Sequence, residues 1–431
     1  MSRTRERLRF GLYAAHLLTL FGIALSNVTL GVALLLFPAL RAKRSARVAP
    51  SRVAPSEDEG DLAAFARARP LLIAVLVYAA LLVVAVIFSL DSATSVDALR
   101  ELFTLAALPL AIGSISGERR LRWLLDAAIL GAALTALFGL AQFWIGFGDL
   151  DRRIRGPFSH VMTFAGILLL VDLVLIARLL FPPSGEMAGN VSRRRGIFGQ
   201  VWLAWGALLA INLALVGSLT RNAWLGLAFG GAWLLWMRRP RLILLALPAT
   251  VAFVAFAPVP ILARALSVTN LSDESTYDRL CMLEAGARMV AEHPLLGVGP
   301  NMVERLYPIY RHASASRLNV PHLHDSYAQI AAERGIPALV SFLALIAVPI
   351  VRAWRGYRTE KSAAETGRAR GTRADLWLGV AAALLAFSLA GLFENNWGDT
   401  EVQRIALLLL AAPFCLELGA AAPEEPSGKA A

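Results

Sequence analysis

Runs of apolar residues about twenty positions long recur along almost the whole chain, from Phe10 to near the C-terminus. A bilayer core about 30 Å thick requires roughly 20 apolar residues per helix. The pattern therefore predicts an all-α polytopic membrane protein with about twelve transmembrane helices. These helices are expected at residues 10–25, 27–40, 70–90, 98–115, 121–146, 157–181, 200–218, 222–237, 241–258, 336–352, 375–393 and 402–418.

The charges of the polar segments between these helices indicate which side of the membrane each segment faces. If residues 10–40 form a hairpin of two helices, the basic segments all fall on one side: MSRTRERLR, RAKRSAR, GERRLR, SRRRG, MRRPR and RAWRGYRTEK. The positive-inside rule identifies that side as the cytoplasm, so both termini are expected there. The predicted organisation is nine helices in residues 1–258, one large outer loop at 259–335, three helices in 336–418 and a cytoplasmic tail at 419–431.

Composition agrees with this class, because 57% of the residues are apolar, 17% are charged and the mean hydropathy is +0.60. The net charge of +11 is explained by topology and by attraction to anionic membrane lipids. The sequence has no basic stripe with interleaved aromatic residues, so a nucleic-acid partner is not expected.

The segments expected on the outer side contain arginines and no lysine, and the arginines of interest are Arg152, Arg153, Arg155, Arg221 and Arg279. Inserting an arginine at mid-membrane costs about 2.5 to 3.5 kcal/mol on insertion scales. An arginine at the end of a transmembrane helix therefore usually has a function. The planar guanidinium matches phosphate oxygens in bidentate fashion. The cluster therefore indicates a site for the diphosphate head group of a membrane lipid.

The alternative is that an outer arginine reaches the interface or pairs with a loop acid. This alternative is preferred for Arg152 and Arg153, which lie beside Asp149 and Asp151. The same two acids form a D-x-D string that could hold a divalent ion, but we expect them to pair with arginines and the protein to work without a metal or cofactor.

The outer loop contains one clear helix, in TYDRLCMLEAGARMVAEHP, where apolar residues recur at helical spacing. Glu284, Arg288 and Glu292 form a charged row that predicts a solvated, ion-paired face. Arg279 is nine residues from Arg288, which places the two on opposite faces at 100° per residue. Arg279 is therefore the better ligand candidate.

The stretch PHLHDSYAQIAAERGIP predicts a second helix that begins near His324 and stops at Gly335. His324 then lies at the positive end of a helix, which helps keep its ring neutral, as a general base requires. Asp325 is expected to cap the first turn. His322 lies outside the helix, and the H-x-H pair lacks an obvious third ligand, whereas zinc sites normally need three or four.

Several motifs occur in the order known from one family: RGPFSHVMTFA (155–165), SLTRNAWLGL (218–227), DRLCMLEAGARMVAEHPLLGVG (278–299) and HDSYAQIAAERG. Together they resemble the O-antigen ligase and polymerase superfamily over about residues 155–340. Twelve helices with a large loop before the tenth also fit this family. One departure is visible, since the final glycine of the family's G-x-x-G element is Ala338 here, which bears on helix packing at the end of the loop.

The resemblance implies a GT-C-like glycosyltransferase of the bacterial inner membrane with its site on the periplasmic side. Its donor would be an O-antigen glycan on undecaprenyl diphosphate, and its acceptor the lipid A core oligosaccharide. The family's essential histidine falls on His324 and its arginines on Arg221 and Arg279. Arg155, Asp325 and His322 are counted with the substrate-binding residues.

A base at His324 predicts direct displacement with inversion at the sugar carbon. A double displacement would need a nucleophilic acid, and Glu333, Glu394 and Asp399 are outer acids with no spacing relation to His324.

Three other functions stay open. An O-antigen polymerase or a protein O-oligosaccharyltransferase would use the same donor with a different acceptor. A lipid-linked oligosaccharide transporter could use the arginines but would not need a base.

Overall fold

The computed structural model describes residues 2–19, 23–40, 63–146, 153–182, 201–245, 255, 259–266, 274–366 and 373–416. Within these residues the chain is helical and contains no β-strand. The helices of the bundle are α1 (Ser2–Leu18), α2 (Ile23–Leu40), α4 (Arg69–Ile87), α6 (Arg100–Leu105), α7 (Ala107–Ser114), α8 (Glu118–Trp144), α9 (Val161–Leu180), α11 (Val201–Gly217), α12 (Arg221–Arg238), α18 (Ala374–Ala390) and α19 (Thr400–Leu416).

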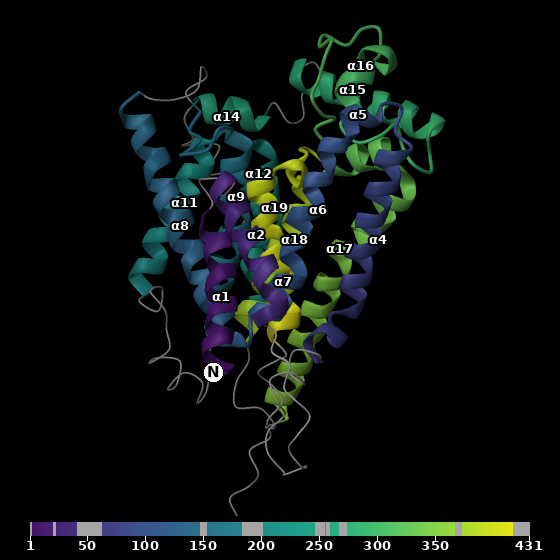
Figure 1. Cartoon of the computed structure of the whole chain (residues 1–431). Helices are drawn as coiled ribbons and strands as arrows, with labels where there is room; N and C mark the ends of the chain where they lie inside the picture. Colours follow the sequence, from purple (N-terminus) through teal and green to yellow (C-terminus); the bar gives the residue numbers. More distant parts are fainter. Residues whose placement is uncertain are drawn as a thin grey trace, which may run out of the picture.

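The remaining elements are one long helix that runs from the large loop into the bundle, and the shorter elements of the connecting segments. They are α5 (Ser92–Ser95), η1 (Val96–Leu99), η3 (Pro240–Leu245), α14 (Val259–Leu266), α15 (Glu274–Glu292), α16 (Val303–Tyr310), α17 (Ser326–Glu365) and η4 (Asn396–Gly398). Figure 1 shows α14, α15 and α16 at the end of the bundle opposite the N-terminus.

Among the described residues, four helices are long and apolar enough to cross a membrane: α4, α8, α9 and α17. Shorter apolar helices cover residues 25–38, 201–217 and 374–390. Large apolar side chains on the outside of the bundle are exposed, among them Leu76 and Trp202, as expected for contact with lipid. The structure is therefore consistent with an all-α membrane protein, while the number of twelve spans stays a prediction.

Most predicted spans coincide with a helix, with two exceptions. The span at 98–115 is divided into α6 and α7 at Ala106. Most of the span at 241–258 lies outside the described residues, which include only η3 and residue 255.

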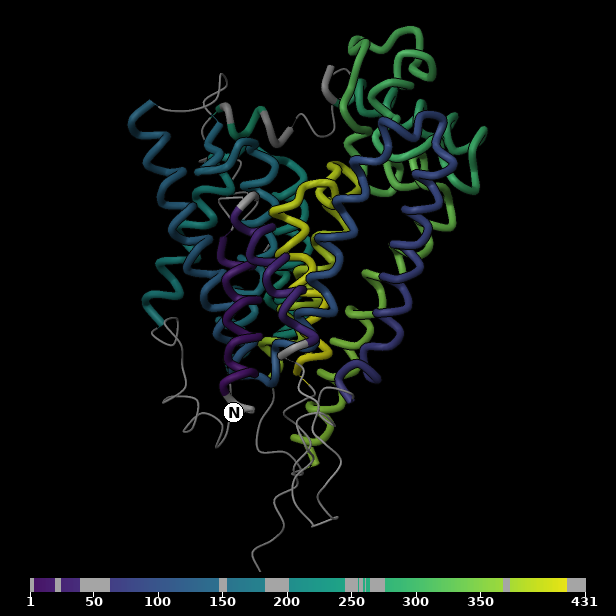
Figure 2. Tube along the Cα trace, viewed as in Figure 1, coloured from purple at the N-terminus to yellow at the C-terminus, as the bar shows by residue number. Residues whose placement is uncertain are grey.

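The bundle is built around α18, whose sequence of small and apolar residues, ADLWLGVAAALLAFSLA, is buried almost throughout. It packs against α9, α12, α17 and α19. On the other side of α17 lies α4, and the two helices run side by side (Figure 2). This packing fixes where the outer ends of α12, α17 and α18 meet.

The outer loop is fastened to α17 at a kink. Gly335 has φ +83° and ψ 170°, so the helix is interrupted there, as its position in the sequence predicts. The turn after α15 fills the break: the N–H groups of Val298 and Gly299 donate to the carbonyls of Ala332 (2.9 Å) and Glu333 (3.1 Å). Beyond the kink, Ala338 is completely buried in the core, so the helix packs with alanine at this position.

Candidate active site

One cavity brings together the three residues that the sequence points to most strongly. It has a volume of about 150 Å³, enough for several water molecules. Its walls come from the start of α12, one face of α15, the segment before α17 and the segment after α18. The lining residues are Arg221, Asn222, Leu225, Thr276, Arg279, Leu280, Leu283, Leu323, His324, Leu392 and Phe393.

Arg221 is the first residue of α12 and is only 8% exposed. It follows a tight turn in which Leu219 has φ +51°, a conformation that is uncommon for a bulky residue. Arg153 holds this turn by donating from Nε to the Ser218 carbonyl (3.0 Å) and from Nη2 to Thr220 Oγ1 (3.3 Å). Arg153 thus contacts the turn before α12, whereas its predicted pairing with a loop acid stays untested, and Arg221 lines the cavity.

Arg279 reaches the cavity from α15, as the helical phase predicts. Its Nη2 lies 3.9 Å from Glu394 Oε2. Arg288 is on the opposite, exposed face, where it pairs with Glu284 at 2.6 Å and donates to the Tyr310 carbonyl at 3.3 Å. The structure therefore places Arg279 on the side of α15 that lines the cavity and Arg288 on the exposed side, while the role of Arg279 as a ligand stays a prediction.

His324 lies just before α17 with φ +51°, a left-handed conformation that costs about 1–2 kcal/mol for a residue with a Cβ. Asp325 then caps the helix, because its Oδ1 accepts from the N–H groups of Tyr327 and Ala328, both at 2.8 Å. The helix starts at Ser326, close to the predicted residue, and the capping role of Asp325 is confirmed. Backbone strain of this kind is typical of functional sites.

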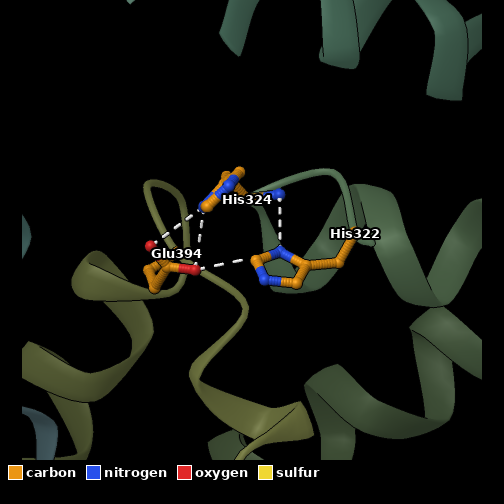
Figure 3. A group of neighbouring side chains, drawn as sticks. All are labelled: His322, His324 and Glu394. Atoms are coloured by element: carbon orange, nitrogen blue, oxygen red, sulfur yellow. Dashed lines mark hydrogen bonds and ion pairs between the residues drawn. The ribbon is translucent and has the colours of Figure 1, made fainter. Parts of the chain in front are cut away.

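The His324 ring is held by Glu394, which follows α18. Nδ1 of His324 lies 3.0 Å from both carboxylate oxygens, as Figure 3 shows. Burial raises the pKa of Glu394, but the hydrogen bond from His324 and the positive charges around it outweigh burial and hold this pKa below its ordinary value. An ionised carboxylate can only accept, so Nδ1 carries the hydrogen and Nε2 is left to accept a proton.

His322 supports this arrangement from the side. Its Nδ1 accepts the N–H of His324 at 3.2 Å, and the two imidazole rings lie 4.2 Å apart between centroids. Burial, assisted by the neighbouring His324, lowers the pKa of His322 to about 4. His322 is therefore neutral at physiological pH, and it contacts the backbone of His324.

Glu394 is the residue that the sequence did not assign. It is brought to His324 because the start of α17 is bonded to the end of α18. The Ser326 N–H donates to the Gly391 carbonyl at 2.8 Å, and its hydroxyl donates to the Glu394 carbonyl at 3.1 Å. The only sequence signal was an acid in the short outer segment GLFENNWGD between two apolar helices.

Glu394 also corrects the argument about metals. The H-x-H pair has a third potential ligand after all, since the ligand atoms of His322, His324 and Glu394 lie within 4.8 Å of one another. A divalent ion at this position would have to displace the hydrogen that His324 shares with Glu394. Metal-free operation therefore stays a prediction that needs its own test.

The other predicted residues lie elsewhere. Arg155 is exposed, donates to the Ser159 carbonyl at 3.0 Å and is not among the residues that line the cavity. Asp149, Asp151 and Arg152 lie outside the described residues. Their predicted pairing stays untested.

Comparison with known proteins identifies one family. No curated protein matches the chain. Residues 205–343 match the family model described as O-antigen ligase. This segment includes Arg221, Arg279 and His324 but ends before Glu394. The match agrees with the motifs in the sequence and supports membership of the O-antigen ligase superfamily.

Proposed function

We propose that the protein is a glycosyltransferase that moves an O-antigen glycan from undecaprenyl diphosphate to the lipid A core oligosaccharide. The observation that carries this proposal is the meeting of His324 with Arg221 and Arg279 in one cavity. A base can accept the proton of the acceptor hydroxyl, and two guanidinium groups can stabilise the negative charge of a diphosphate leaving group. A transporter would need the cations but not the base.

In the proposed reaction, Nε2 of His324 takes the proton of an acceptor hydroxyl as its oxygen attacks the sugar carbon that carries the diphosphate. The bond from that carbon to the diphosphate oxygen breaks, and the lipid diphosphate leaves with the electron pair. Arg221 and Arg279 stabilise the negative charge that develops on the leaving group. One displacement inverts the configuration at that carbon.

The apolar walls of the cavity suit lipid substrates. Leu280, Leu283, Leu392 and Phe393 line the cavity and are at the same time partly exposed on the surface of the protein. A lipid chain could contact this surface while its head group reaches the arginines. The proposal includes a GT-C-like architecture with twelve spans, an inner-membrane location, and an active site on the periplasmic side at the end opposite the N-terminus.

The function is tested with the purified full chain and a glycan on undecaprenyl diphosphate. Three acceptors are offered in parallel: lipid A core, a second lipid-linked glycan and a serine-containing peptide. We expect mass spectrometry to find the glycan on lipid A core. Transfer only to the second glycan would identify a polymerase, and transfer only to the peptide a protein O-oligosaccharyltransferase.

Transfer is expected to continue in the presence of EDTA, because two guanidinium groups already supply the positive charge that a metal would provide. The initial rate is measured before and after exhaustive chelation. Activity that disappears with EDTA and returns with Mg²⁺ or Mn²⁺ would instead indicate a metal at His322, His324 and Glu394.

Glu394→Gln is expected to lower the rate at least about 10-fold, because the carboxylate orients the His324 ring and stabilises the imidazolium that forms when Nε2 takes the acceptor proton. The single-turnover rate is measured for the variant and the parent protein. His322→Gln is the comparison, because burial lowers the pKa of His322 to about 4 and this neutral ring contacts the backbone of His324, so a smaller loss is expected. A rate in Glu394→Gln equal to that of the parent protein would contradict the assignment.

A further inference from the structure

Asn222 is a buried polar residue of the cavity that the reaction described above does not use. It is the second residue of α12, is 6% exposed and lines the cavity between Arg221 and Leu225. Its carboxamide has no hydrogen-bond partner among the residues that the structure describes. Its N–H donors are therefore available to a ligand that enters the cavity.

The end of α12 provides a second, independent observation. Thr220 occupies the cap position, but its hydroxyl donates to the Ser218 carbonyl at 3.2 Å and accepts from Arg153 at 3.3 Å. It therefore does not cap the helix. The backbone N–H groups of Asn222 and Ala223 donate to no residue in the described part of the chain. An uncapped helix start presents free donors and a positive partial charge, both of which favour an anion.

We propose that Asn222 is a further substrate-binding residue that donates from its carboxamide to the diphosphate of the donor lipid, together with the free amides of the first turn of α12. This inference rests on the proposed function, because it assumes a diphosphate in the cavity. Arg221 and Arg279 supply charge, while the amide donors have fixed directions and add none. Asn222 thereby distinguishes a correctly placed diphosphate from any anion attracted by the arginines.

Because the proposed ligand is negatively charged, a variant that places a negative charge at residue 222 tests the proposal most sharply. Asn222→Asp keeps the shape of the side chain but replaces the donor by a carboxylate, which repels a diphosphate. Asn222→Ala only removes the donor. Binding is measured by titrating the purified full chain in detergent micelles with undecaprenyl diphosphate and, separately, with undecaprenol, which has the same chain but no phosphate.

We expect Asn222→Ala to weaken binding of undecaprenyl diphosphate about 10-fold and Asn222→Asp about 100-fold or more. Binding of undecaprenol should be the same in both variants and the parent protein. Asn301→Asp is the control, because it adds the same negative charge at an exposed residue outside the cavity. The backbone of Asn301 has φ +61°, a conformation that aspartate also adopts. It should bind both probes normally.

Two results would overturn the inference and leave the proposed function intact: diphosphate binding unchanged in both variants, or binding of undecaprenol weakened as much as that of the diphosphate. The second result would mean that Asn222 is needed for the structure of the site. If the parent protein itself binds undecaprenyl diphosphate no better than undecaprenol, the proposed function fails, and the inference fails with it.

Discussion

His324→Ala is expected to lower the rate of glycan transfer about 10²- to 10⁴-fold while the donor lipid still binds. The variant removes the only imidazole among the described residues that line the cavity, but it leaves Arg221 and Arg279 in place. The measurement is a single-turnover rate with purified protein, paired with a titration of the donor. A faint residual rate is expected, because binding and charge stabilisation persist.

His312→Ala is the matched control, since His312 is a half-buried histidine of the outer loop that bonds to Ser314 and does not line the cavity. Its rate should equal that of the parent protein. If His324→Ala instead moved the lipid-linked glycan across a membrane at a near-normal rate, the protein would be a transporter and the enzyme assignment would be wrong.

Arg279→Ala and Arg221→Ala are each expected to weaken donor binding and to slow transfer about 10²- to 10³-fold. Each removes one of two guanidinium groups that face the cavity, and the leaving diphosphate then carries charge that is not neutralised. Lysine should restore little, because an ammonium is a point charge without the planar fork that matches two phosphate oxygens. Donor affinity and single-turnover rate are measured for the alanine and lysine variants together.

Arg288→Ala serves as the control on the same helix, since Arg288 pairs with Glu284 on the exposed face. Its activity should be unchanged. Full activity in Arg279→Ala combined with a loss in Arg288→Ala would show that the wrong face of α15 had been assigned to the site.

The parts of the site that could be predicted depend on local rules. The phase of α15 follows from the helical period, the cap at Asp325 from its position before an apolar run, and the break at Gly335 from glycine chemistry. Each of these involves residues within a few positions of one another. The same holds for the choice of Arg279 over Arg288.

The pairing of His324 with Glu394 could not be predicted, because 70 positions separate the two residues and only the packing of α17 against α18 brings them together. Glu394 could not be recognised as a third potential metal ligand beside His322 and His324 for the same reason. The division of the fourth predicted span into α6 and α7 does have a local signal, because Pro109 has no N–H to donate to the carbonyl of Leu105, the last residue of α6.

The stereochemistry of the product tests the central claim most directly. If His324 acts as a base in a single displacement, a donor with an α-linked diphosphate must give a β-linked product, because the acceptor oxygen attacks from the opposite side of the sugar carbon. The new linkage is assigned by NMR on glycan transferred by the purified protein. A β linkage is the predicted result. An α linkage, or a glycosyl group trapped on Glu394, would contradict the account.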